Sequence, residues 1–502
     1  MKLRFAVPAV LAFATTSGAT FAGGIETPGL GVQGLGRGGA WLARADDALA
    51  AHFNPAAMVR NPDGAHLGAH LMLRKHCFER MGEDGAPVSP GQGLNAAPGE
   101  VCADIPPFPN PQVGATYHLA RRFAIGLAVV GPHKHGVAKW PTVVQYENAF
   151  GVKDADHPAP QRYLMLDDDA LAVFPTLSAS YAILPNLSVG AGFIWGLASF
   201  EFSNMAVAVS TPEDAAQHDI KSTISGFDGF MPGFVASAAW APTRRLELAG
   251  WYRFVDAIKS DVDLFAEANY FNQGRVDEEA IADPANQTRL EDAGTFRFVL
   301  PMEARLALRY RHPRSSRGQQ AFVTKHGGYA RDPMSEDLFD LELDLGWANN
   351  SAVKSVEIFM SEGIQINGTP GFVPPDAGIV RNWRDVVDVR LGGEFVAIPD
   401  LLAVRAGGFF ESKGVEDRYL SLDFHQGTKF GFGAGATVRL ATFDVSASYG
   451  HTFFGALDNG GQGAVHGLSG DETTGFRTTQ VINGGRATAS LDEVALGATV
   501  HY

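Results

Sequence analysis

Charged side chains recur at alternate positions of segments that otherwise read as apolar strands. These inward candidates are Arg253, Arg297, Arg305, Arg309, Asp340, Glu342, Asp344, Asp388, Arg390 and Glu394. An Arg or Lys that faces lipid at the membrane midplane costs about 2–4 kcal/mol, so we expect these groups on an inner face. Most should form ion pairs within the wall. Arg253, Arg297 and Arg390 are the candidates for binding a ligand carboxylate, because guanidinium and carboxylate groups pair well.

Other reactive residue types give weaker signals. Ser448 and His451 are close in sequence, as an outer-membrane lipase would need, but alternation places Ser448 in the interior and no nucleophile motif surrounds it. Gly29 to Gly34 matches the dinucleotide pattern GxGxxG, yet it lacks the preceding strand and the following βαβ unit. The histidines are scattered without converging ligands. We therefore expect no enzyme, no cofactor and no metal site.

Composition narrows the class of protein. The chain has 502 residues, 58 Gly, 19% charged residues and a charge balance of 40 − 55 = −15. Low charge with abundant glycine suits a membrane β-barrel or a secreted β protein, and the acidic balance argues against a nucleic-acid partner. The two cysteines, Cys77 and Cys102, are too few for a disulfide scaffold. In an oxidising exported compartment they are expected to form one disulfide, in the loop after the first strand.

The N-terminus indicates export. Lys2 and Arg4 precede a short apolar stretch, and Thr20 and Ala22 stand where a cleavage site before Gly23 needs small residues. Residues 1–22 are therefore predicted to be a secretory signal peptide. No later apolar run approaches the roughly 20 residues of a membrane-spanning helix.

Period-two alternation predicts the fold. In residues 338–347, Phe339, Leu341, Leu343, Leu345 and Trp347 alternate with Asp340, Glu342, Asp344 and Gly346. A soluble sandwich also alternates, but alternating short and long connections favour an outer-membrane barrel, as do aromatic residues near strand ends. Those aromatics are Trp195, Trp240, Tyr310, Trp347, Trp383 and Tyr449. The fold class predicted is all-β, a 14-stranded antiparallel transmembrane β-barrel.

The expected strands are 65–74, 111–119, 123–131, 170–183, 187–202, 229–240, 246–258, 294–310, 337–348, 383–397, 402–412, 428–440, 443–454 and 490–502. An even number places both ends of the barrel on the periplasmic side. Residues 311–336 are long and polar where a short turn is due, so they are predicted to be a periplasmic insert.

The segment after the signal peptide resembles a known family. Gly34-Leu-Gly36-Arg37, then Ala45-Asp46-Asp47-Ala48, then Phe53-Asn54-Pro55-Ala56-Ala57-Met58 resembles the N-terminal hatch of the FadL/TodX outer-membrane transporters of long-chain fatty acids and hydrocarbons. Ala57 stands where that family commonly has Gly. Residues 232–253, 297–309 and 382–394 resemble strands of the same family.

This resemblance implies three parts: residues 1–22 as signal peptide, 23–60 as a hatch inside the lumen, and 61–502 as the barrel with long external loops. The hatch residues carried over are Gly36, Arg37, Asp46, Asp47, Phe53, Asn54, Pro55 and Ala56. External loops 203–228 and 259–293 would form a capture groove. Its candidate residues are Met205, Val207, Val209, Phe265, Tyr270 and Phe271.

The resemblance also implies a function. A hydrophobic small molecule, a fatty acid before a neutral aromatic or alkane hydrocarbon, would be captured outside and bound inside the plugged barrel. It would leave sideways through an inward kink of the third strand. The expected partners are this ligand, outer-membrane lipids and the barrel-assembly machinery, for a monomer in the outer membrane of a Gram-negative-type bacterium. An outer-membrane barrel lipase is the alternative from another class.

Overall fold

The protein is described from a computed structural model. It covers residues 31–88, 99–130, 137–147, 153–207, 216, 219–272, 275–314, 322–323, 329–361, 363–369, 372–468 and 477–502. The predicted signal peptide and residues 23–30 of the predicted hatch lie outside these ranges. Within the described part of the chain, no helix is long and apolar enough to cross a membrane.

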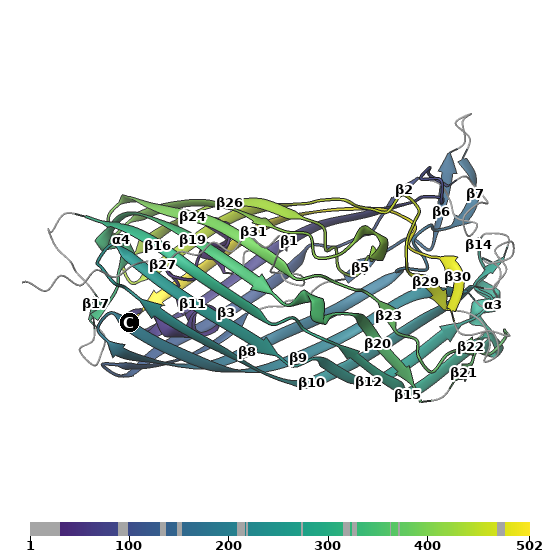
Figure 1. The fold of residues 1–502 in the computed structure, drawn as a ribbon, viewed down its shortest axis with the longest axis horizontal. Coiled ribbons are helices and arrows are strands. Elements are labelled where there is room, and N and C mark those ends of the chain that lie inside the picture. Colours follow the sequence, from purple (N-terminus) through teal and green to yellow (C-terminus); the bar gives the residue numbers. More distant parts are fainter. Residues whose placement is uncertain are drawn as a thin grey trace, which may run out of the picture.

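Fourteen antiparallel strands form a closed ring, because β1 pairs with both β3 and the last strand β31 (Figure 1). This confirms the predicted fold class. In ring order the wall strands are β1 Gly64–Arg80, β3 Phe108–Ala120, β4 Phe123–Val130, β8 Asp167–Leu184, β9 Leu187–Val207, β10 Asp219–Trp240, β11 Leu246–Val255, β16 Glu303–Pro313, β19 Asp337–Ala348, β24 Val386–Ile398, β25 Leu402–Glu411, β26 Lys429–Leu440, β27 Phe443–Phe454 and β31 Gly485–His501.

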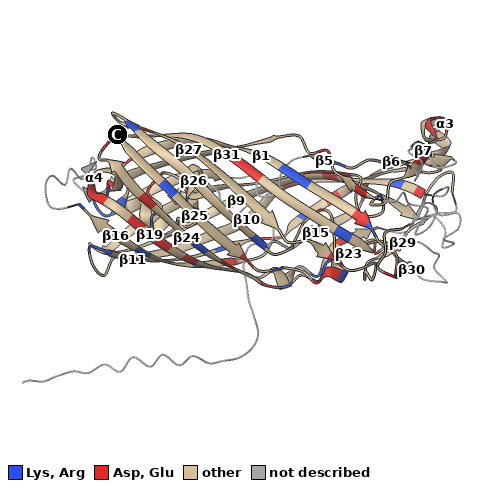
Figure 2. Ribbon diagram, turned by 90° about the horizontal axis from the view of Figure 1, so that it is seen from above, with Lys and Arg blue, Asp and Glu red and all other residues tan. Residues whose placement is uncertain are grey.

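The two faces of the wall differ as alternation predicts. Outward side chains are large and apolar, with Leu67 64% exposed, Leu306 66% and Leu496 61%. Inward neighbours such as Asp340 and Glu342 are buried. In Figure 2 most of the wall is tan. Lys, Arg, Asp and Glu colour only short stretches of the strands and parts of the two ends. An apolar outer belt around a polar interior is the surface of a membrane-spanning barrel.

The wall continues on one side beyond the ring. After β11, the chain breaks at Asp256 and Ala257 and resumes as β12 Ile258–Glu267, which pairs with the first half of β10 and with β15 Gln287–Phe298. β15 pairs in turn with β20 Ser355–Met360. The expectation that 203–228 and 259–293 are loops was therefore wrong over much of both ranges, because paired strands rise above the membrane there.

Smaller elements gather at the two ends (Figure 1). At the loop end are β2 Glu100–Cys102, β5 Val137–Lys139, β6 Val143–Glu147, β7 Lys153–Pro158, β13 Phe271–Asn272, β14 Arg275–Val276, α3 Glu278–Ala282, β21 Ile364–Gln365, β22 Phe372–Val373, β23 Ile379–Val380, β28 Leu457–Asp458, β29 His466–Leu468 and β30 Arg477–Val481, with short 3-10 turns at Pro284–Asn286, Asn350–Ala352 and Asp417–Tyr419.

The predicted insert lies at the opposite end, beside the C-terminus (Figure 1). Its described parts are β17 Phe322–Val323, β18 Tyr329–Ala330 and α4 Pro333–Glu336. Met334 packs against Val396 and Ala403 of the wall. The insert therefore covers part of the end where the strand turns are short.

The N-terminal segment 31–60 lies inside the ring. It forms α1 Val32–Gly36, α2 Ala50–Phe53 and the 3-10 helix η1 Pro55–Arg60. Its groups contact inward side chains of well-separated wall strands, such as Asp340 of β19 and Ser188 of β9. We call residues 31–60 the described hatch.

Two positional expectations were wrong for a shared reason. Trp383 is buried at 1% exposure, with rings of Phe298 and Phe424 around it, and does not belong to an interfacial girdle. Cys77 lies within β1, directly opposite Cys102 of β2, and not in a loop. In both places the strand boundary differs from the expected one: β24 begins at Val386 and β1 runs on to Arg80.

Candidate ligand-binding cavities and hatch

Two large apolar cavities lie between the loops and the hatch. The inner cavity is lined by aromatic and aliphatic side chains from β8, β9, β11 and β15, including Phe174, Phe200 and Phe296, and its empty space of about 1170 Å³ includes space open to solvent. The outer cavity, whose empty space is also about 1170 Å³ with open solvent included, lies nearer the loop end between β9, β10, β20 and β23. Both are lined by Leu164, Phe202, Asn204, Ile379 and Arg381. The two cavities therefore meet, and together they offer a mainly apolar path into the barrel.

The structure brings together part of the expected capture groove. Met205, Tyr270 and Phe271 are buried in one apolar cluster with Tyr163, and Met205 lines the outer cavity. Phe265 is half-buried on β12, where the Arg289 guanidinium lies 3.7 Å from its ring centre. Val207 ends β9. Its side chain and the whole of Val209 lie outside the described residues, so their predicted role stays a prediction.

The three arginines expected to bind a carboxylate are all engaged by acids of the wall. Arg253 lines the inner cavity and lies 3.0 Å from Glu303. Arg390 is buried with its Nε 2.5 Å from Asp388 Oδ1. Their predicted inward placement is confirmed, whereas their predicted role in binding ligand stays untested.

Arg297 corrects the sequence interpretation. Its side chain is 45% exposed and forms a two-pronged contact of 2.9 Å with Glu357 on the outer surface. The inward neighbours are Phe296 and Phe298, which line the inner cavity. Residues 299–302 separate β15 from β16, with Pro301 among them, and interrupt the alternation. When the two-residue alternation is carried across this break, Arg297 is assigned to the inner face, whereas it lies on the outer face.

In the described part of the chain, the ladder between β3 and β4 is short beside the inner cavity, and we call this place the window. β4, the third wall strand, ends at Val130, and its pairing with β3 covers only residues 113–120. Among the described residues, the upper part of β3 has no strand partner on that side. A small cavity lies at this place, lined by Phe108 of β3, Val137 of β5, Asp168 of β8 and Pro106. We call it the window cavity.

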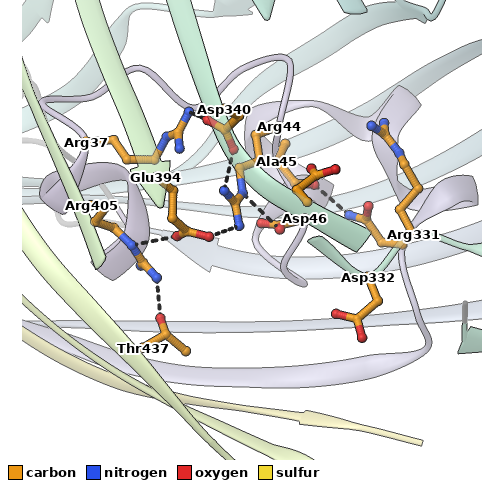
Figure 3. A network of polar contacts seen from close by, with 12 residues as sticks. Arg37, Arg44, Ala45, Asp46, Arg331, Asp332, Asp340, Glu394, Arg405 and Thr437 are labelled. Carbon is orange, nitrogen blue, oxygen red and sulfur yellow. Dashed lines mark hydrogen bonds and ion pairs between the residues drawn. The ribbon is translucent and has the colours of Figure 1, made fainter. Parts of the chain in front are cut away.

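The charged hatch residues form a network with the wall (Figure 3). The Arg44 guanidinium lies 2.6 Å from Asp340 and 2.6 Å from Glu394, and 3.0 Å from Asp46 of the hatch itself. Glu394 also pairs with Arg405 at 3.0 Å. Buried charges are stable only when paired and hydrogen-bonded, so these contacts fix how the hatch sits in the lumen.

The Asn54 to Ala56 motif works through two kinds of contact. The Asn54 amide donates to the Leu42 carbonyl at 2.7 Å, which closes the hatch on itself. The Ala56 N–H donates to Ser237 of β10, and its carbonyl accepts from Ser188 of β9 at 2.7 Å. Pro55 begins the 3-10 helix between them, where its missing N–H costs nothing.

Gly36 packs against Ser448 and Arg405, and Phe53 contacts the His52 ring.

The cysteine pair and the serine–histidine pair have different outcomes. Cys77 and Cys102 form the predicted disulfide, joining β1 to β2 at the loop end. Ser448 is buried against the hatch, whereas His451 pairs with Asp492 at 2.8 Å on the outer face. The wall therefore separates Ser448 from His451, and this pair offers no hydrolytic site.

Comparisons with known proteins report the fold. A FadL homologue from Pseudomonas aeruginosa has a TM-score of 0.67 and 18% identity over 95% of this chain and 100% of its own. The toluene transporter TodX from Pseudomonas putida has a TM-score of 0.57 and 12% identity over 95% and 99%. TbuX from Ralstonia pickettii, also a toluene transporter, gives 0.54 and 12% over 95% and 99%. This chain has the FadL/TodX barrel fold. No protein-family model and no curated protein matches it.

The FadL/TodX fold confirms the resemblance at the level of architecture. A closed barrel with an apolar outer belt has the surface of a membrane-spanning protein. Sequence reasoning missed Arg381, where the two large cavities meet, and Arg74 at the window cavity. Arg74 has the same parity on β1 as the buried His70 and Met72, which is the signal that could have found it.

Proposed function

We propose that this protein takes up hydrophobic small molecules across the outer membrane, and that long-chain fatty acids are its ligands. The observation that carries the proposal is the pair of joined apolar cavities, which begin under the loops and end above a lumen that the hatch fills. A long alkyl chain gains about 0.8 kcal/mol for each CH₂ moved from water into such a site. A water-filled pore would give the alkyl chain no such gain in free energy.

The route follows from the same features. The ligand would bind first in the outer cavity beside Met205 and then pass Arg381 into the inner cavity. It would leave through the window beside β4, which is where the resemblance to the FadL/TodX family places lateral release. Movement of the hatch would gate this last step.

Neutral hydrocarbons are the second candidate. Arg253 and Arg390 are already neutralised by Glu303 and Asp388, which favours a ligand without charge. TodX and TbuX, which share the fold, are toluene transporters.

Competitive displacement of a fluorescent fatty acid from purified protein tests the proposal. Oleate, toluene and hexadecane should be compared as competitors. We expect oleate to displace the probe at the lowest concentration, with hexadecane weaker and toluene weakest. Stronger displacement by toluene would favour the hydrocarbon alternative, and no displacement by any of them would contradict the proposal. Release of fatty acid from lipid vesicles, measured in parallel, would favour the lipase alternative.

Gating by the hatch needs a separate test. Deletion of Gly23 to Arg37 removes the turn that Asp340 and Glu342 hold. We expect this deletion to raise single-channel conductance in planar bilayers or to abolish selective uptake. Uptake at the normal rate without a leak would contradict gating.

A further inference from the structure

We propose that Arg74 binds the anionic head group of the ligand at the window while the alkyl chain lies in the inner cavity. The assignment rests on the proposed function and deepens it. It defines a head-group site in the window cavity, separate from the apolar cavity that holds the chain. It also gives the ligand a direction, with its carboxylate at the opening in the wall.

Arg74 is an inward-facing cation without a bonding partner. It is half-buried on β1 and lines the window cavity. Among the residues that the structure describes, none makes a hydrogen bond or an ion pair with its guanidinium. The contrast with Arg253, Arg297 and Arg390 is clear, since each of these lies within 3.0 Å of an acid. A guanidinium inside a barrel has little water to solvate it, so an anion would be stabilised there.

Two acids act on Arg74 from a distance without capturing it. Asp168 and Asp423 are the groups whose charge it feels. Asp423 is itself held by the guanidinium of Arg381. Among the described residues, no ion pair joins Arg74 to either acid, so its donors are available to another acceptor.

Asp168 also connects the two spaces. It lines both the inner cavity and the window cavity, so the two spaces adjoin at this side chain. The rest of the window cavity is mostly apolar, with Met72, Ile105, Pro106 and Phe108. Apart from Asp168, the cation therefore stands among apolar side chains, an arrangement that suits a ligand with one charged end and one apolar end. It gives no advantage to a neutral hydrocarbon.

The window itself suits a head group. Pro109 and Pro111 on the upper part of β3 lack an N–H, as strand edges without a partner tolerate. A carboxylate held by Arg74 would lie beside this edge of β3.

The test compares two ligands that differ only in the head group. Binding of oleate and of oleyl alcohol is measured at pH 8 for the full-length protein in detergent, for Arg74→Gln, for Arg74→Lys and for the control Lys75→Gln. Lys75 is the next residue of the same strand and is exposed on the opposite face. Heat-modifiable migration on gels verifies that each variant forms a closed barrel.

We expect Arg74→Gln to weaken oleate binding at least tenfold and to change oleyl alcohol binding less than twofold, because a charge-assisted contact is lost only for the acid. Arg74→Lys should restore part of the oleate affinity, and Lys75→Gln should bind both ligands normally. Unchanged oleate binding in Arg74→Gln, or an equal loss for both ligands, would overturn the assignment while leaving the proposed function intact. If the unmodified protein binds neither ligand, the proposed function fails, and the assignment fails with it.

Discussion

The guanidinium of Arg37, in the hatch, lies 2.7 Å from the carboxylate of Asp340 on β19, and both side chains are fully enclosed. Asp340 also accepts from Arg44 and from Arg309, so one wall carboxylate joins two hatch cations and a neighbouring strand. Glu342, two residues along β19, accepts from the backbone of Ala43 at 2.6 Å. The hatch is therefore held on one side of the barrel by charge and on the other by serine hydroxyls.

Replacing Arg37 should loosen the hatch without unfolding the barrel. Arg37→Ala leaves Asp340 and Glu342 with one cation fewer, and breaking a buried pair costs about 3–5 kcal/mol. We expect conductance openings in planar bilayers to become frequent. The control is Arg384→Ala, which breaks an ion pair with Glu416 whose arginine is 62% exposed. An exposed pair contributes at most about 1 kcal/mol, so this variant should behave as the unmodified protein does.

Gly433 of β26 should be intolerant of a side chain. A Cβ at this position would overlap with the carbonyl oxygen of Leu35, near the C-terminal end of α1. Gly433→Val should therefore push the hatch away from the wall and produce a leak, at a cost of about 1–3 kcal/mol for overpacking. Gly250→Val is the matched control, because a Cβ there meets only Leu306 Cδ2, at 3.4 Å. A sealed barrel in Gly433→Val would show that the hatch turn adapts.

Hatch closure should depend on pH through Asp47. Burial, with a contribution from Asp46, raises the pKa of Asp47 to about 7. A carboxyl whose pKa is raised in the closed state binds more protons there than in water, so closure weakens as pH rises from about 4 to 7 and stays weak above. Leak conductance of the unmodified protein should be higher at pH 8 than at pH 5.

Asp47→Asn should abolish this difference in leak conductance, because an asparagine side chain is uncharged at both pH 5 and pH 8. Asp400→Asn, at a side chain 59% exposed at the same end of the barrel, should leave it in place. Equal pH dependence in all three proteins would contradict the role given to Asp47.

The insert should stabilise the base of the hatch. The Arg331 N–H donates to the Arg60 carbonyl at 2.8 Å, and the Arg331 guanidinium pairs with Glu247 of β11. Arg331→Ala should increase hydrogen–deuterium exchange of the amides in 55–61 about tenfold, since a charged hydrogen bond contributes about 1.5–3 kcal/mol. Lys259→Ala, which removes an exposed pair with Asp256, should leave that exchange unchanged. Equal exchange in both variants would contradict the prediction that the insert stabilises the hatch.

Sequence reasoning could predict the wall because alternation is a local property. Residues 337–348 and 443–454 were predicted with the bounds that β19 and β27 have, since polar and apolar side chains alternate there without interruption. The hatch could be identified from its motifs, although its partners could not. Nothing local indicates that Arg44 meets Glu394, which is 350 residues away in the chain.

The failures lie where the period breaks. Arg297 was placed inward because the count was carried across Pro301, and the loop ranges were overestimated because strands above the membrane no longer need an apolar outer face. Arg74 is the last residue of the predicted strand 65–74, and alternation alone assigns it no role. The role proposed for Arg74 depends on the end of β4 at Val130, which the structure shows and the sequence pattern does not.

The mixed-charge layer formed by Arg44, Glu394, Arg405 and the insert has a consequence for transport energetics. An alkyl chain moving straight toward the periplasm would have to displace ionic contacts and give up its apolar surroundings at every carbon. The same chain moving sideways exchanges one hydrocarbon-like phase for another at almost no change in free energy. Under the proposed function, the barrel would act as a phase-transfer device, in which the charged layer at its base sets the partition boundary and the membrane is the receiving solvent.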